Sequence, residues 1–152
     1  MTGYEPQLIE REWNRATDRD WADALRGIPL LSDIDKRNLR RLAKSSHFAE
    51  FSPGDIVLLK GAPSDSFYVI LSGEARALRE PGARTLKTGD FFGEMGALDG
   101  TPRSATVVAT SELHVMRVPR QAFLELLGES GHVTLSVLTE LGARVRRLEQ
   151  RG

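Results

Sequence analysis

The 152-residue sequence contains no cysteine and only three histidines. Without cysteine the chain can form neither a disulfide nor an iron–sulfur cluster nor a thiolate zinc site, and the lack of disulfides agrees with a cytoplasmic location. His47, His114 and His132 are far apart in the sequence. We do not expect them to converge on a metal as the histidines of a jelly-roll metalloenzyme do, so we expect no metal site and no metal cofactor.

Long apolar runs and an excess of one charge are also absent. No run approaches the roughly 18 apolar residues of a spanning helix, and the N-terminus lacks a signal peptide's basic start and apolar middle. Lys plus Arg and Asp plus Glu both number 21, so no overall basic field attracts DNA or RNA. We expect a cytoplasmic protein without membrane contact or direct DNA binding. A Gly-x-Ser-x-Gly elbow and a Walker loop are missing as well, and we expect no enzyme.

The length allows one domain with a sizeable core, but not two full domains. Between His47 and Val118, short apolar strands alternate with glycine, proline and aspartate turn signals. This pattern predicts a mainly β fold with flanking helices: an antiparallel jelly-roll β-barrel with N-terminal helices and a C-terminal lid or dimer helix. We divide the chain into an N-terminal helical segment (1–27), the barrel domain with its flanking helices (28–128) and a C-terminal helix (129–152).

The segments before the barrel have helical periodicity. Apolar residues between Glu5 and Leu25 predict one or two amphipathic helices, whose tryptophans could anchor on the barrel or form a partner surface. Asp33 is predicted to cap a second helix over 34–45. Its buried face would consist of Ile34, Leu39, Leu42 and Ala43.

The segments after the barrel are predicted to form two more helices. Pro119 should begin the first, with Phe123, Leu124 and Leu127 buried and Gly128 at its end. In the last segment, apolar residues at alternating spacings of three and four form a short coiled-coil seam. We favour a homodimer through this seam, although so short a seam could also pack on its own barrel. The seam consists of Leu138, Leu141, Val145 and Leu148.

The most informative stretch runs from Phe91 to Val108. A glycine-punctuated turn there carries Glu94 and, nine residues later, Arg103. Glycines let backbone N–H groups approach an anion, and arginine supplies a fork of donors that matches a phosphate. A carboxylate would repel the same phosphate, so Glu94 must face another part of the ligand, such as a sugar hydroxyl. A phosphate together with a sugar indicates a nucleotide.

Two stretches of this region, FGEMGAL (92–98) and TPRSATV (101–107), resemble the phosphate-binding cassette of cyclic-nucleotide-binding domains. The resemblance is to the type found in catabolite activators and protein-kinase-A regulatory subunits. It extends upstream to FSPGD (51–55), Gly61, DSFYVI (65–70) and LSGE (71–74), and covers roughly Ile28 to Leu127. A Gly-Glu pair with a distant arginine would be weak by itself, whereas the cassette and the upstream glycines together are specific.

The resemblance implies a role for each cassette residue. Residues matching Glu94 accept a hydrogen bond from the ribose 2′-hydroxyl, and residues matching Arg103 pair with the exocyclic phosphate oxygens. Gly96 departs mildly from the family, because many relatives carry alanine there. The expected ligand-binding residues are Phe92, Gly93, Glu94, Met95, Gly96, Ala97, Arg103, Ser104 and Ala105.

The resemblance further implies a cytosolic receptor for a cyclic nucleoside monophosphate. Ser104 is compatible with cAMP and cGMP, and we favour cAMP. The receptor would signal to a separate effector protein through rearrangement of its C-terminal helix, which would also cap the exposed base. The candidate capping residues are Leu141, Arg144, Val145 and Leu148. The alternative is an interaction module that uses the fold without depending on a nucleotide.

Overall fold

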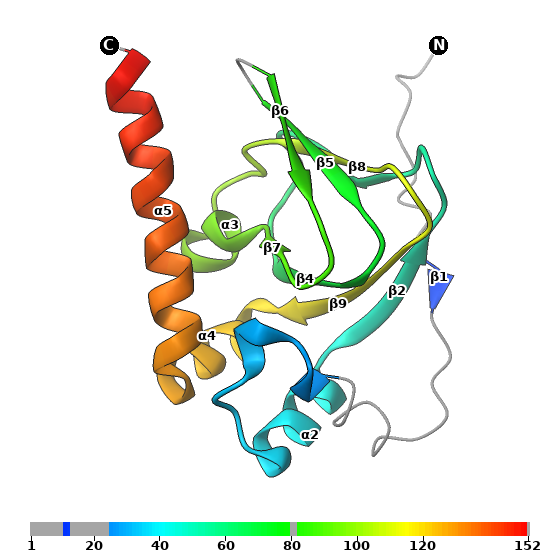
Figure 1. The fold of residues 1–152 in the computed structure, drawn as a ribbon, viewed down its shortest axis with the longest axis vertical. Coiled ribbons are helices and arrows are strands. Elements are labelled where there is room, and N and C mark those ends of the chain that lie inside the picture. Colours follow the sequence, from blue (N-terminus) through cyan, green and yellow to red (C-terminus); the bar gives the residue numbers. More distant parts are fainter. Residues whose placement is uncertain (1–10, 13–24, 80–81, 152) are drawn as a thin grey trace.

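The computed structural model describes residues 11–12, 25–79 and 82–151. Short strands occupy the middle of the chain and helices flank them on both sides (Figure 1). In chain order the elements are β1 (Arg11–Glu12), η1 (Pro29–Leu31), α2 (Lys36–Ser45), β2 (His47–Phe51), β3 (Ile56–Leu58), β4 (Ser66–Ser72), β5 (Ala75–Arg79), β6 (Gly82–Leu86), β7 (Phe91–Phe92), α3 (Glu94–Asp99), β8 (Thr106–Ala109), β9 (Leu113–Pro119), α4 (Arg120–Glu129) and α5 (Gly131–Arg151).

The strands form two antiparallel sheets. One has five strands in the order β1-β2-β9-β4-β7, and the other has four in the order β3-β8-β5-β6. The mainly β class with flanking helices is therefore confirmed. The closed barrel is not: among the described strands no ladder joins the two sheets, which face each other across a shared core.

The N-terminal prediction is partly wrong. Arg11 and Glu12, which were expected to be helical, form β1 and pair with Glu50 and Ala49 of β2. The other residues of the expected helices between Glu5 and Ala24 lie outside the described residues.

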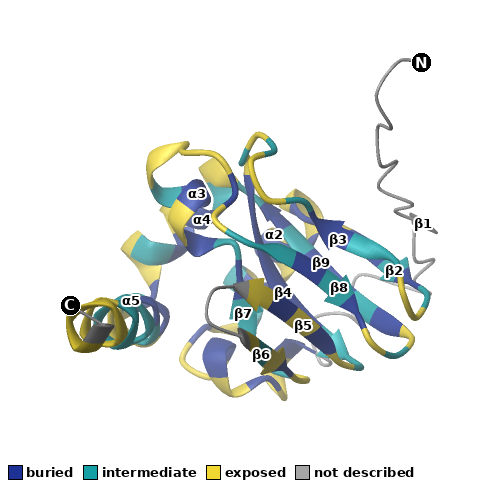
Figure 2. Ribbon diagram, turned by 90° about the horizontal axis from the view of Figure 1, so that it is seen from above, coloured by how far each residue is buried: buried dark blue, intermediate teal, exposed yellow. Residues whose placement is uncertain are grey.

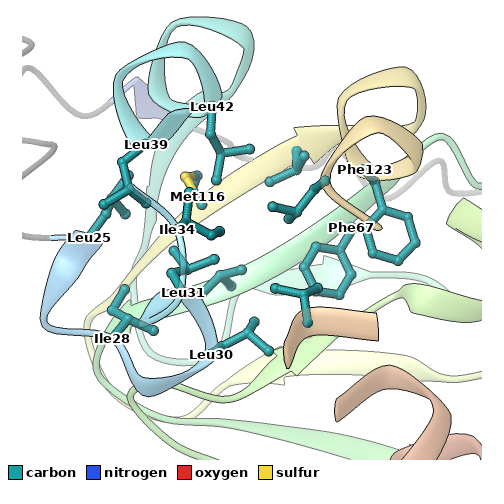
Figure 3. Packing of buried hydrophobic residues seen from close by; sticks show 14 of the residues in the cluster. Leu25, Ile28, Leu30, Leu31, Ile34, Leu39, Leu42, Phe67, Met116 and Phe123 are labelled. Atoms are coloured by element: carbon teal, nitrogen blue, oxygen red, sulfur yellow. The ribbon is translucent and has the colours of Figure 1, made fainter. Parts of the chain in front are cut away.

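Two apolar clusters lie on the two faces of the five-stranded sheet. Alternation along β4 sends Tyr68 and Ile70 into the cluster between the sheets, and Phe67 and Val69 into a second cluster on the outer face. Figure 3 shows this outer cluster, where η1, α2 and α4 cover the sheet and Phe67 stacks on Phe123. The ring centroids of this stacked pair are 4.3 Å apart.

Helix capping differs from the sequence prediction. Asp35, not Asp33, caps α2, because its Oδ1 accepts the backbone N–H of Asn38 at 2.8 Å. Asp33 instead lies at the start of α5, where its carboxylate accepts the Ser130 hydroxyl at 2.6 Å and the His132 N–H at 3.2 Å. Ser130 in turn accepts the Val133 N–H, so α5 begins at a cap shared with the loop before α2.

The helices after the sheets also depart in detail from expectation. Pro119 ends β9 and precedes α4 as its N-cap, and α4 continues past Gly128 to Glu129. Leu126, not Leu124, joins Phe123 in the core, while Leu124 is exposed. The long helix α5 turns its inner side toward the domain and its outer side to solvent (Figure 2). No helix among the described residues is long and apolar enough to cross a membrane.

Candidate functional site

The cassette begins where β7 turns sharply into α3. Gly93 makes this turn with a φ of +81°, a backbone angle that residues with a side chain rarely adopt. A Cβ added at this position would also lie 2.8 Å from Nη1 of Arg103. The sequence predicted a turn over these residues, whereas the structure continues them as a short helix that starts at Glu94. Gly93 therefore both permits the turn and leaves space for the arginine.

Glu94 is completely buried at the start of α3. Neither of its carboxylate oxygens accepts a hydrogen bond from the part of the chain that the structure describes. Nη2 of Arg144 lies 2.8 Å from Oε1 and forms an ion pair with it, without a hydrogen bond. A buried carboxylate without hydrogen-bond donors is costly, and a ligand hydroxyl would satisfy it.

Arg103 is only 6% exposed and lies beside the same turn. Its Nη1 donates to the carbonyl oxygens of Ser66 at 3.0 Å and Gly93 at 3.2 Å. The guanidinium lies 5.5 Å from the centre of the Tyr68 ring, which stacks on Phe92. Burial lowers the pKa of Arg103, and the nearby Tyr68, Asp65 and Glu94 partly oppose this effect. The backbone bonds fix one edge of a positively charged fork that never loses its proton near neutral pH.

A pocket opens between this cassette and the four-stranded sheet, with about 440 Å³ of empty space that is partly open to solvent. Glu94 and Ala97 are buried and do not line the pocket. Of the predicted binding residues, the pocket is lined by Phe92, Gly93, Met95, Gly96, Arg103, Ser104 and Ala105. The remaining wall consists of Leu58, Ala77, Arg84, Leu86, Phe91, Val107 and Arg144.

The glycine at position 96 has a packing reason. A Cβ there would lie 2.1 Å from Oγ of Ser64 and 2.2 Å from its Cβ. The Ser64 hydroxyl is buried and has no hydrogen-bond partner among the described residues. Ser64 thus occupies the space that an alanine methyl would need, which accounts for the departure from the residue common in the family.

The far end of α3 is held by Arg120 at the start of α4. Its Nε donates to the Ala97 carbonyl at 3.1 Å and its Nη2 to the Leu98 carbonyl at 3.0 Å. These carbonyls lie in the last turn of α3, where a cation is favourable. Arg120 therefore ties the cassette to the junction of β9 and α4.

Helix α5 runs alongside α3 and reaches the pocket through Arg144 (Figure 1). Besides its ion pair with Glu94, Arg144 donates from Nη1 to the Met95 sulfur at 3.0 Å. One turn earlier, Glu140 pairs with Arg84 of β6 and lies 3.5 Å from Nε of Arg144. A chain of alternating charges therefore connects β6, α5 and the cassette.

The four candidate capping residues separate into two groups. Arg144 lines the pocket, and Leu141 is half-buried against the outer apolar cluster. Val145 and Leu148 are 53% and 63% exposed and do not line the pocket.

Sequence reasoning missed Arg84, Glu140 and Arg120. Each is a charged residue of ordinary type at a position without a motif, and each reaches the site through a contact distant in the sequence. No signal in the sequence alone could have identified them.

Comparison with known proteins decides the family. Residues 48–130 match the family described as cyclic nucleotide-binding domain, which is more than half of the chain. The chain belongs to this family. The family is a regulatory one, and its description names a cyclic nucleotide as the ligand.

Among the similar proteins of this family is the cAMP-dependent protein kinase regulatory subunit of Hypocrea atroviridis. It is 37% identical over 114 residues, which cover 74% of this chain and 25% of the relative. The chain thus spans about a quarter of that protein's length.

Solved structures of cyclic nucleotide-binding domains have the same fold. The structure described as Sp-2Cl-cAMPS bound to PKAR CBD2 superposes with a TM-score of 0.74 at 25% identity and covers 87% of this chain and 91% of its own. The regulatory subunit of a cAMP-independent protein kinase A from Trypanosoma brucei superposes with a TM-score of 0.71 at 26% identity and covers 83% and 47%.

Proposed function

We propose that this chain is a receptor whose pocket binds a cyclic nucleoside monophosphate through Arg103 and Glu94. The observation that carries the proposal is the buried Glu94 carboxylate, which lacks a hydrogen bond from the described residues and lies near a buried guanidinium. A phosphate joined to a ribose satisfies both groups at once: the anion pairs with Arg103, and a hydroxyl donates to Glu94. A free phosphate would satisfy only the arginine.

The other predicted binding residues have supporting roles in this proposal. Backbone groups of Gly93, Gly96 and Ser104 complete the phosphate cradle, since small residues and a helix start place N–H donors close to an anion. Ala97 and Ala105 keep the cradle shallow, and Phe92 supports Arg103 through Tyr68. Met95 lies between the pocket and α5.

We propose cAMP as the preferred ligand over cGMP. The support is indirect: the curated relative is named as a cAMP-dependent regulatory subunit, and the similar structure holds a cAMP analogue. Ser104 agrees with either base.

The proposed signal passes through α5. Arg144 already contacts the carboxylate that the ribose would use, so ligand and helix share one buried group. A ligand that binds better to one position of α5 shifts the helix toward that position, by no more than its difference in affinity for the two. Arg144 and Leu141 are placed to cap the base; Val145 and Leu148 would have to turn inward.

We further propose a cytoplasmic, non-enzymatic protein that acts on a separate effector protein, without direct DNA binding.

The outer face of α5 supports a homodimer, since three residues of the predicted seam are more than half exposed. A solvent-exposed apolar stripe of this kind is typical of a helix that pairs with another.

A second function remains consistent with one observation. A similar structure is described as a cAMP-independent protein kinase A subunit, so the fold alone does not require cAMP. In that case the domain would be an interaction module, and the Arg144–Glu94 ion pair would hold α5 in place permanently.

Titration calorimetry on the full chain distinguishes these functions. We expect saturable one-to-one binding of cAMP and weaker binding of cGMP. Linear 5′-AMP should bind far more weakly, because its phosphate carries a second negative charge and is not closed into a ring, whereas the proposed cradle fits a cyclic monoanion. Absence of binding by both cyclic nucleotides would favour the interaction module. Equal binding of all three nucleotides would contradict a site built for the cyclic phosphate.

A further inference from the structure

A second polar cluster lies on the five-stranded sheet and shares no residue with the nucleotide pocket. Glu50 of β2 and His114 of β9 are direct partners across the two strands. Ser72 of β4 is the partner of His114 on its other side. Glu112, in the bend just before β9, brings its carboxylate to the same group. The side chains come from three neighbouring strands and one bend.

The cluster faces away from the core between the sheets. Residues that flank Glu50 and His114, such as Ala49, Phe51, Leu113 and Val115, belong to that core, so strand alternation turns the two polar side chains to the outer face. Glu50 and His114 are half-buried there, and Glu112 is exposed. The site is therefore held by the sheet and remains open to solvent on one side.

The spacing of the ligand atoms suits a small divalent cation. One nitrogen or oxygen from each of Glu50, Glu112 and His114 lies within 4.8 Å of the others, and Nε2 of His114 is 3.4 Å from a Glu50 oxygen. Two ligands about 2.0–2.1 Å from a tetrahedral zinc ion are roughly 3.3–3.4 Å apart. The histidine and Glu50 already have this separation, and the exposed Glu112 can close on the ion by rotating its side chain.

Ser72 orients the imidazole for this role. Its hydroxyl oxygen lies 2.9 Å from Nδ1 of His114. When Nδ1–H donates to that oxygen, the Nε2 lone pair points toward the two carboxylates. Histidines that bind metals usually donate their other ring N–H in this way.

We infer that Glu50, Glu112 and His114 form a site for a divalent cation of the zinc type, with water completing the coordination. Two carboxylates at this separation repel each other, and a cation between them removes the repulsion. One imidazole and two carboxylates are ligands that zinc accepts and that magnesium, which keeps its water shell, rarely selects. The bound ion joins the bend before β9 to β2 and stabilises that end of the sheet. The sequence expectation of no metal site considered only convergence of several histidines, whereas this proposal rests on one histidine and two carboxylates.

Zinc titration of the full, tag-free chain tests this inference, in a phosphate- and nucleotide-free buffer at about pH 7.5 after removal of metals with a chelator. Calorimetry is expected to show one saturable Zn²⁺ site, and Mg²⁺ is expected to give none. His114→Gln, Glu50→Gln and Glu112→Gln should each weaken Zn²⁺ binding at least tenfold, and Ser72→Ala should weaken it less. The matched controls are His47→Gln and Glu74→Gln, which replace an exposed histidine and an exposed carboxylate outside the cluster and should bind as the wild type does.

A second readout separates loss of the site from loss of the fold. Saturating Zn²⁺ should raise the unfolding temperature of the wild type and of both controls, but not that of His114→Gln. Absence of saturable Zn²⁺ binding by the wild type would overturn the inference. Unchanged binding by a folded His114→Gln chain would overturn it as well, because the ion would then lie elsewhere.

Discussion

At the scale of single residues, the site depends on two glycines whose lack of a side chain leaves space for a neighbouring residue. Gly93 leaves space for Arg103, and Gly96 leaves space for Ser64. The sequence predicted the importance of both glycines through the family resemblance. It did not predict the reason for Gly96, because Ser64 lies far from it in the chain and carries no motif.

We predict that Gly96→Ala lowers the free energy of unfolding by about 1–3 kcal/mol, the usual cost of forcing a methyl group into a filled site. Ser64→Gly removes the Cβ and hydroxyl that would lie nearest the methyl, and the next atom is the Thr101 carbonyl oxygen at 3.0 Å. In the double variant Ser64→Gly/Gly96→Ala, most of the loss should therefore be recovered. Urea unfolding of the four proteins measures this coupling. Strictly additive losses would show that Ser64 is not the obstacle.

At the scale of elements, the sequence was reliable for strands and helices with a strong apolar pattern. The prediction from sequence failed for elements whose structure depends on contacts between residues distant in the chain. The segment Glu94–Asp99 is too short to show helical periodicity, and glycines flank it on both sides; Gly93 and Gly100 cap α3, and Arg120 donates to a carbonyl near its end. Asp33 fits the sequence pattern of an N-cap, yet the fold brings it to α5, almost a hundred residues away.

The cap shared by Asp33 and Ser130 gives a prediction about pH. The Ser130 hydroxyl, together with the His132 N–H, lowers the pKa of Asp33 below its ordinary value. A carboxylate with a lowered pKa stabilises the fold fully above its unfolded pKa of about 3.9, and this contribution is lost as the pH falls through the folded pKa. Asp33→Ala should cost on the order of 1 kcal/mol at pH 7 and speed hydrogen exchange in the first turn of α5.

Urea unfolding at pH 7 and near pH 3 checks this prediction. The difference between the wild type and Asp33→Ala should shrink at the lower pH, because the wild-type carboxylate is then becoming protonated as well. A difference that stays constant would show that Asp33 acts through packing and not through its charge.

Helix α5 should respond to nucleotide more than its neighbours do. We predict slower hydrogen exchange over residues 134–148 when cAMP is bound, because the helix closes over the base. The buried residues of α4 around Phe123 and Leu126 provide the internal control and should change less. Faster exchange in α5 would contradict the lid, and unchanged exchange would contradict any ligand-dependent rearrangement.

At the scale of the whole molecule, the exposed seam of α5 predicts self-association. Leu138 and Leu148 of this helix are 59% and 63% exposed. We expect Leu138→Glu/Leu148→Glu to shift a concentration-dependent dimer to monomer in sedimentation velocity, because buried charges would oppose the pairing. Leu124→Glu, on the exposed side of α4, is the matched control and should leave the dimer intact. A wild type that stays monomeric at all concentrations would contradict the dimer.

The sequence predicted the mainly β class of the fold correctly, but it did not predict correctly whether the two sheets join into a closed barrel. Alternating apolar strands and turn residues predict antiparallel sheets, whereas the pairing of edges depends on contacts between strands distant in the chain. The two sheets therefore meet through their apolar faces, and the sequence prediction of a closed barrel was wrong. The pocket lies where the cassette, the four-stranded sheet and α5 meet.

The central claim is that a cyclic phosphate binds to Arg103 in this pocket, and one calorimetric comparison tests it most directly. Wild type and Arg103→Ala are titrated with cAMP at the same ionic strength, after circular dichroism has shown that both are folded. Loss of the buried charge-assisted fork should weaken binding by about 2–5 kcal/mol. If the folded Arg103→Ala chain binds cAMP as tightly as the wild type does, the phosphate does not bind at Arg103 and the account is wrong.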